Sequence, residues 1–172
     1  YWAYEMLGWG GYWAWDPVEN SSLIPWLIGV ASIHTMLVQK RSLKTTDGIG
    51  RYAKTNLILS ILTYVLVLYS TFLTRSGVLG DASVHSFVDP GNLVYFFLVV
   101  FISTFIAIGI GGIAYRWKYL EDKTVYEESV LSRELSLFTA AIILVASAII
   151  VLVGSSAPLF GQSVDTFFYD EM

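Results

Sequence analysis

The chain has 172 residues with a formal net charge of −4, and 55% of them are hydrophobic whereas only 14% are charged. Charged residues make up about a quarter of a typical soluble domain, so this composition excludes an ordinary soluble domain and indicates an integral membrane protein. The absence of cysteine excludes disulfides, thiolate metal sites and a cysteine nucleophile. The chain begins Tyr-Trp-Ala-Tyr, without an initiator Met or a basic leader, so we interpret it as an internal segment of a longer polytopic protein.

An aromatic stretch, residues 9–26, dominates the start of the chain. Five of the six tryptophans lie between Trp2 and Trp26, with the carboxylates of Asp16 and Glu19 among them, and a glycine pair lets the backbone come close to a flat ligand. Because an indole has a large apolar face and one N–H, two interpretations stay open: an aromatic belt at the membrane surface, or a platform for a planar ligand. The candidate ligand-binding residues of this stretch are Trp9, Gly10, Gly11, Tyr12, Trp13, Trp15, Asp16, Pro17, Glu19, Asn20 and Trp26.

Four apolar runs are candidate transmembrane helices, at residues 23–39, 57–74, 93–115 and 135–154. Crossing the hydrocarbon core takes about 20 helical residues, and an open sheet cannot satisfy its backbone groups in lipid. The predicted fold class is therefore all-α, a polytopic integral membrane protein with about four transmembrane helices in this chain, preceded by an external amphipathic segment.

The first of these runs is short for a membrane span. We expect Pro25 and Trp26 to lie in its opening turn within the headgroup layer, where proline is tolerated because that N–H has no helical partner. Residues 20–22 (Asn-Ser-Ser) are expected to supply the N-cap. The Asp16-Pro17 pair is expected to set a turn before the helix.

Basic residues gather in two of the connections. Nine of the ten lysines and arginines lie in the loops 40–56 and 116–134, and the positive-inside rule places such loops in the cytoplasm. The segment 1–22, the loop 75–92 and the tail 155–172 therefore share the external face, which in a Gram-negative cell is the periplasm.

Three further residues are candidates for function. His34 lies inside the first span, where an ionisable group is costly and is a functional candidate by default; it would either make an interhelical hydrogen bond to a Ser or Thr or ligate a metal such as haem iron. His85, in an external loop, would either be solvated or act as a ligand. Arg75, the lone external cation of the sequence, would either anchor the chain at the membrane surface or pair with an acidic group such as a haem propionate.

The order of residues in these motifs carries a resemblance. The aromatic stretch reads Trp-Gly-Gly-Tyr-Trp-Ala-Trp-Asp-Pro-Val-Glu-Asn over residues 9–20, and the chain later reads Thr-Phe-Leu-Thr-Arg-Ser-Gly-Val-Leu over 71–79 and Ser-Val-His-Ser-Phe over 83–87. In register, these segments resemble the tryptophan-rich WWD signature and the following sequence of the CcmF family, the haem lyase subunit of the system I pathway of cytochrome c maturation. Tyr12 stands where that family usually has Trp, and it keeps a planar face. The Val-Glu-Asn that follows Asp-Pro favours CcmF over the related WWD protein of system II, whereas NrfE-type paralogues stay open.

The resemblance implies a protein that handles haem. The aromatic stretch would be the external platform on which haem is laid, and His85 would be an axial ligand of that haem. His34 would be an axial ligand of a separate, structural b-haem in the membrane. The second ligand of each haem would lie outside this chain. Asp16 and Glu19 would shape the platform, and no catalytic residue is assigned.

The resemblance also implies a reaction and its partners. The chain would belong to a haem lyase that is active only within a complex of the bacterial inner membrane, with the aromatic face in the periplasm. Haem would arrive from the haem chaperone CcmE and be attached by two thioether bonds to the Cys-X-X-Cys-His motif of apocytochrome c. CcmH would present the apocytochrome, and quinol would supply electrons through the b-haem. No nucleic-acid partner is expected.

Two other classes of function stay open. In a transporter, the aromatic face would be the exit for haem carried across the bilayer, although one intramembrane histidine makes a sparse polar path. In a non-catalytic assembly subunit, the aromatics would form a belt and the histidines would only pack. A haem spectrum separates the assembly subunit from the other two classes, and attachment of externally supplied haem separates the lyase from the transporter.

Overall fold

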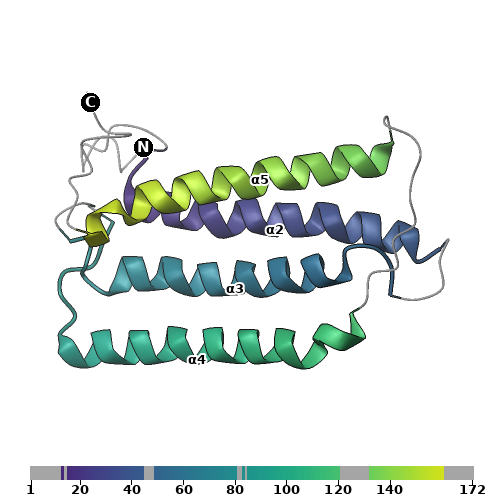
Figure 1. The fold of residues 1–172 in the computed structure, drawn as a ribbon. Coiled ribbons are helices and arrows are strands. Elements are labelled where there is room, and N and C mark those ends of the chain that lie inside the picture. The colour runs from purple at the N-terminus through teal and green to yellow at the C-terminus, as the bar shows by residue number, and fades with distance from the viewer. Residues whose placement is uncertain are drawn as a thin grey trace.

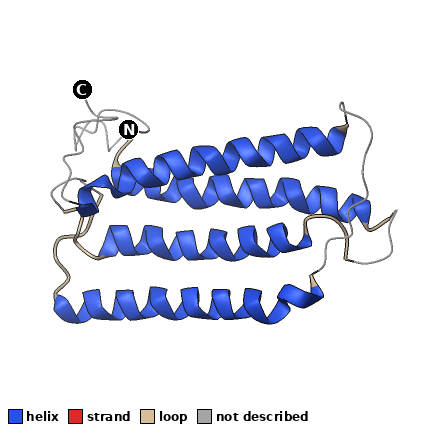
Figure 2. Cartoon of the chain, viewed as in Figure 1, coloured by secondary structure: helices blue, strands red, loops and turns tan. Residues whose placement is uncertain are grey.

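The described part of the chain is a bundle of four long helices, with no strand among its residues (Figures 1 and 2). The computed structural model describes residues 13, 15–44, 49–80, 83, 85–120 and 132–160. The elements, in chain order, are α2 (Pro17–Ser42), α3 (Ala53–Arg75), α4 (Asn92–Arg116), the short 3₁₀ helix η1 (Trp117–Tyr119), α5 (Arg133–Ser156) and the 3₁₀ helix η2 (Ala157–Phe160).

The four helices are long and apolar enough to cross a membrane. The shortest, α3, has 23 residues, which at 1.5 Å per residue gives about 35 Å, more than the roughly 30 Å of a hydrocarbon core. Within the described residues, four helices meet the criteria of length and hydropathy for a membrane span. The predicted all-α polytopic membrane fold is confirmed.

The helices lie side by side in the order α5, α2, α3, α4 (Figure 1). The main core joins α5, α2 and α3, through Ile24, Leu27, Ile28 and Ala31 of α2, Leu59 and Leu66 of α3, and Ala141 and Ala148 of α5. The two α5 alanines, seven residues apart on one face, let α5 approach α2 closely, as small residues do in membrane bundles. Two hydroxyl pairs join α2 to α3, Ser21–Ser70 at 2.8 Å and Ser32–Ser60 at 3.3 Å between the Oγ atoms.

Helix α4 contacts the bundle along one edge only. Its single buried residue is Gly109, and a Cβ built there would lie 2.7 Å from Cγ2 of Ile61 on α3. The missing side chain therefore sets how closely α3 and α4 approach. The other faces of α4 carry exposed Phe, Ile and Val side chains, as expected of a helix that faces lipid.

The start of α2 differs from the sequence expectation. The helix begins at Pro17, not near residue 23, and its N-cap is Asp16, whose carboxylate accepts hydrogen bonds from the backbone N–H groups of Val18 and Glu19. The predicted cap at residues 20–22 and the placement of Pro25 in the opening turn are therefore wrong. An Asp cap followed by proline at the first helical position is a stronger start signal than the Asn-Ser-Ser segment. The backbone N–H at that position has no partner within a helix, so its absence in proline costs nothing.

The two ends of the bundle differ in charge. At one end, Glu134 of α5 accepts a hydrogen bond from Nη1 of Arg51 at 3.1 Å and pairs with Nε of Arg41 at 3.3 Å. The Lys54 ammonium lies 4.8 Å from the ring centroid of Trp117 at the same end. The described lysines and arginines other than Arg75 thus gather where α2 ends and α5 begins, as a positive-inside arrangement requires. Which side of a membrane this end faces stays a prediction.

Candidate functional site

The opposite end of the bundle brings the aromatic stretch and the loop 75–92 together at Asp16. Its Oδ2 accepts hydrogen bonds from Ser83 Oγ at 2.6 Å and from His85 Nδ1 at 3.2 Å, besides capping α2. The carboxylate is buried, and four donors converge on one oxygen. Asp16 is therefore both the start of a helix and the anchor of a loop far away in the sequence.

Ser83 transmits this anchor to the backbone. It donates its hydroxyl to Asp16 and accepts the backbone N–H of His85 at 3.1 Å. The backbone of His85 is thus held by Ser83, and its ring is held by Asp16. Sequence reasoning did not assign Ser83 a role; its spacing two residues before a histidine, typical of a Ser turn, was the only signal.

His85 lies between two carboxylates of α2. Its Nδ1 is hydrogen-bonded to Asp16, and its Nε2 lies 3.7 Å from Oε1 of Glu19. An ionised carboxylate that already accepts three N–H and O–H groups can only accept from the ring, so Nδ1 carries the proton. In the neutral ring, Nε2 then presents the lone pair. His85 is half-buried and fixed in orientation, which differs from a freely solvated loop histidine.

Asn20 folds the end of the aromatic stretch back onto α2. Its Nδ2 donates to the carbonyl oxygen of Trp15 at 2.8 Å, and its Oδ1 accepts from Nε1 of Trp13 at 3.2 Å. Trp15 has a φ of 58°, a left-handed conformation that costs a tryptophan free energy. The two indoles remain 39% and 45% exposed. Asn20 thus fixes Trp13 and Trp15 near the start of α2, with both indoles partly exposed.

Not all predicted residues of the aromatic stretch gather here. Trp26 is exposed on α2, and ten residues of helix separate it from Asp16 by about 15 Å along the axis. Trp9, Gly10, Gly11 and Tyr12 lie outside the described residues.

The loop 75–92 rests on a small apolar core. Leu79 is fully buried with Leu73 and Val18, against Tyr69, Phe72 and Leu159. Arg75 is exposed, and its guanidinium carbon lies 4.4 Å from the ring centroid of Phe87, a distance typical of a cation–π contact. Its predicted pairing with an acidic group stays a prediction.

Gly77 allows the tight entry into this loop. It has a φ of +75°, and a Cβ there would lie 2.9 Å from the backbone Cα of Asp89. We expect Gly77→Ala to lower the free energy of unfolding by more than about 1 kcal/mol, because both the left-handed conformation and the contact with backbone penalise a side chain. Thermal unfolding in detergent measures this, with Gly91→Ala as control, since its φ is +84° but nothing lies within 4 Å. Equal losses in the two variants would assign the effect to φ alone.

His34 lies in the second half of α2, far from His85. Its Nδ1 lies 2.7 Å from the carbonyl oxygen of Val30, which can only accept, so Nδ1 donates and Nε2 presents the lone pair. A metal-ligating histidine usually makes such a bond with its other nitrogen. This hydrogen bond stays within α2, whereas the sequence also allowed a hydrogen bond from His34 to a Ser or Thr of a neighbouring helix. Eighteen residues from Asp16 to His34 correspond to about 27 Å, so the two histidines belong to separate sites.

The two imidazoles fit axial ligation of haem iron. Each has Nδ1 directed to an oxygen and Nε2 on the opposite side of the ring. The half-buried His34 ring lies within a helix that is long and apolar enough to span a membrane, a setting suited to a porphyrin. At His85, Nε2 lies 3.7 Å from Oε1 of Glu19, so a haem iron held by this nitrogen would have that carboxylate as a neighbour.

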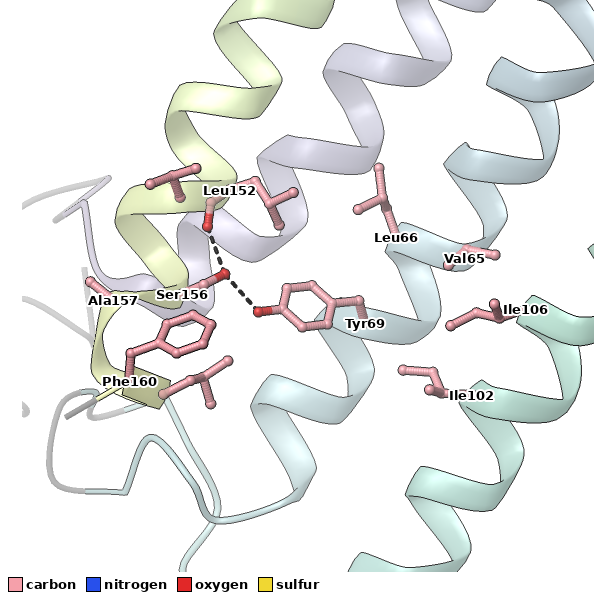
Figure 3. Close-up of a pocket in the computed structure, with 11 residues that line it drawn as sticks. Val65, Leu66, Tyr69, Ile102, Ile106, Leu152, Ser156, Ala157 and Phe160 are labelled. Carbon is pink, nitrogen blue, oxygen red and sulfur yellow. Dashed lines mark hydrogen bonds between the residues drawn. The ribbon is translucent and has the colours of Figure 1, made fainter. Parts of the chain in front are cut away.

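An apolar cavity of about 660 Å³ lies between α3, α4 and the end of α5 (Figure 3). Its one polar feature in the close-up is a hydrogen-bond chain, in which Ser156 Oγ donates to Leu152 O at 2.6 Å and Tyr69 OH lies 2.7 Å from Ser156 Oγ. Because the serine donates to the carbonyl, the phenol donates to the serine and joins α3 to α5.

We expect Tyr69→Phe to lower the free energy of unfolding by about 0.6 kcal/mol, the average for an interhelical hydrogen bond in a membrane protein. Tyr64→Phe is the matched control, because Tyr64 lies on the α4 side of the same helix and meets Phe105 edge-on. Thermal unfolding in detergent compares the two. A Tyr69→Phe loss no larger than that of Tyr64→Phe would show that the bond adds nothing.

Comparison with known proteins agrees with the motifs. A family model described as cytochrome C assembly protein matches residues 1–79. The chain is 38% identical to the cytochrome c-type biogenesis protein CcmF of Haemophilus influenzae, over 100% of this chain and 26% of that protein. It is 39% identical to CycK of Bradyrhizobium diazoefficiens, over 99% of the chain and 25% of that protein.

An NrfE-type relative is equally similar. The probable cytochrome c-type biogenesis protein NrfE of Escherichia coli is 38% identical over 92% of this chain and 27% of its own length. The chain thus spans about a quarter of the length of these relatives, and no solved structure matches it significantly. The chain belongs to the CcmF family of cytochrome c-type biogenesis proteins.

Proposed function

We propose that this chain is the haem-binding part of a cytochrome c maturation protein, in which His85 ligates the haem that is to be transferred. The observation that carries the proposal is the contact between Asp16 of the aromatic stretch and His85 of the loop. A carboxylate that fixes Nδ1 of an imidazole orients the ring and raises the basicity of Nε2 as a ligand. Two exposed indoles lie close by in sequence, and flat aromatic faces suit a flat, mostly apolar macrocycle.

Arg75 extends this site toward the charged edge of haem. Its exposed guanidinium lies at the same end of the bundle, held over Phe87. A guanidinium pairs well with carboxylates, so we assign it to a propionate. With the propionates held there, the vinyl groups are left for the incoming apocytochrome.

His34 is proposed as a ligand of a second, b-type haem within the membrane. Two observations support this: Nδ1 of His34 donates a hydrogen bond to Val30 O, and His34 lies about 27 Å along α2 from Asp16, the residue that holds His85. When bound, such a haem supplies one-electron chemistry, and quinol is the proposed electron source. The chain's own contribution is to hold one axial nitrogen in a fixed orientation.

The proposed reaction is the addition of two substrate thiols to two haem vinyl groups. Each S–H of the Cys-X-X-Cys-His motif adds across a C=C bond, which forms a thioether with no leaving group. The thiols belong to apocytochrome c, in agreement with a chain that has no cysteine. The proposed partners are the haem chaperone CcmE, apocytochrome c and its presenting subunit CcmH. The proposed location is the bacterial inner membrane, with the His85 end in the periplasm.

Asp16 is proposed to act as a positioning residue. Asp16→Ala removes the cap of α2 and should lower the free energy of unfolding by about 1 kcal/mol. It also frees the imidazole and should lower cytochrome c maturation about 10- to 100-fold, the usual cost of losing an outer partner of a ligand.

Asp16→Asn separates these two roles. The amide oxygen still caps the helix, so stability should stay within about 0.5 kcal/mol of the wild type, while maturation should stay reduced because the neutral amide is a weaker partner for imidazole. Thermal unfolding and a reporter cytochrome c measure the two effects. Full maturation in the Asn variant would reduce Asp16 to a structural residue.

The whole protein, purified in mild detergent with its partner subunits, tests the proposed lyase function. External haem and a reduced apocytochrome c are added, and covalent haem is followed by its resistance to acid–acetone extraction. We expect attachment only in the presence of the protein. Attachment at the same rate without it would contradict a lyase and favour the transporter.

A further inference from the structure

A second pocket lies at the basic end of the bundle, between the end of α2 and the start of α5. Its volume is about 290 Å³. We call it the basic pocket; its walls include Leu37, Lys40, Arg41, Lys44, Arg133 and Glu134. Neither the resemblance nor the proposed haem chemistry uses it, and it lies at the opposite end from His85.

The basic pocket carries an excess of positive charge. Four cations face one carboxylate, and the four basic residues are exposed whereas the Glu134 side chain is only 11% exposed. Arg51, which lies outside the lining, donates to Oε2 of Glu134 at 3.1 Å. The negative charge of Glu134 is therefore already paired with Arg51, and its other oxygen lies 3.3 Å from Nε of Arg41. The site thus has one guanidinium paired with Glu134 and two exposed lysines around a concave surface.

An apolar strip leads from the pocket into the membrane-spanning part of α2. Leu37, in the pocket wall, is 47% exposed, and Ile33, one turn deeper on the same side, is 57% exposed. Both helices that form the pocket meet the criteria for membrane spans, so the pocket lies where headgroups meet hydrocarbon. Charge for an anion and an apolar path therefore adjoin each other.

We propose that the basic pocket binds the headgroup phosphate of an anionic phospholipid, with one acyl chain along Leu37 and Ile33. Clusters of basic residues between transmembrane helices attract anionic headgroups, and arginine offers paired donors to phosphate oxygens. A zwitterionic lipid carries its own cation beside the phosphate and would meet the lysines unfavourably. The excess charge thus selects a lipid with net negative charge over phosphatidylcholine.

The test uses the whole protein in detergent, with bound lipid counted by native mass spectrometry. Phosphatidylglycerol and phosphatidylcholine with identical acyl chains are titrated separately. The pocket variant is Lys40→Gln, Lys44→Gln, Arg133→Gln, and the control is Lys54→Gln, Arg116→Gln, Lys118→Gln, which removes equal charge at the same end of the bundle outside the pocket. Because the pocket variant removes three of the four cations that line the site, its phosphatidylglycerol affinity should fall at least about tenfold, whereas that of the control should fall less than about threefold.

Three results would overturn the proposal: wild type that binds both lipids equally, equal loss of affinity in the two triple variants, or displacement of phosphatidylglycerol by millimolar inorganic phosphate. The last would assign the pocket to a free anion. The outcome is independent of haem binding, because both variants leave the two histidines intact.

Discussion

His85→Ala is expected to lower maturation of a reporter cytochrome c by at least about a hundredfold, more than the 10- to 100-fold loss typical for an outer partner of a ligand. The reason is geometric. His85 is held by Asp16 and by Ser83 in one orientation, so no other described side chain of the loop is placed to supply an equivalent nitrogen. The b-type spectrum of the membrane haem should persist, because the two sites lie about 27 Å apart along α2.

Two controls accompany this variant. Ser86→Ala changes the next residue, whose hydroxyl donates to the carbonyl oxygen of the adjacent Phe87, and should retain maturation. Imidazole added to the His85→Ala protein should restore part of the activity if the lost group was an iron ligand. Unchanged maturation in His85→Ala would remove the residue from the site.

His34→Ala is expected to abolish the b-type absorption of the whole protein in mild detergent. A haem that loses one of two axial nitrogens becomes high-spin or dissociates, since ligation is what holds it in place. Folding should be little affected, because the ring is half-buried and its recorded hydrogen bond stays within its own turn. The measurement is the difference spectrum between the dithionite-reduced and oxidised protein.

Ile33→Ala is the matched control for this change. Its side chain is adjacent, 57% exposed and apolar, so it tests loss of volume without loss of a ligand. We expect a full b-type spectrum in this control. A full spectrum in His34→Ala would assign the membrane haem, if present, to other ligands.

Hydropathy predicted the four helices because long apolar runs have few alternatives in a bilayer. The start of α2 escaped prediction because the sequence offers two competing cap signals. The segment 20–22 has a cap-like composition, yet Ser21 is fully buried and its hydroxyl faces Ser70 of α3. The cap falls on Asp16, where the following proline fixes the first helical position.

The candidate site was only partly predictable for a different reason. The sequence motifs identified Asp16, Glu19 and His85 as candidates. Asp16 and His85 are 69 positions apart in the sequence, and a contact over that distance leaves no pattern in the local sequence. The packing of Leu79 against Val18 and Leu73 brings the loop onto the start of α2. Ser83 then acquires its role only from that packing.

The haem stoichiometry of the whole protein tests the central claim most directly. After loading from the haem chaperone, haem is counted by the pyridine haemochrome method in the wild type, His34→Ala, His85→Ala and the double variant. If His34 and His85 each hold one haem at a separate site, the wild type should contain about two haems per protein. Each single variant should contain about one, and the double variant none. Two haems retained in both single variants would contradict the account.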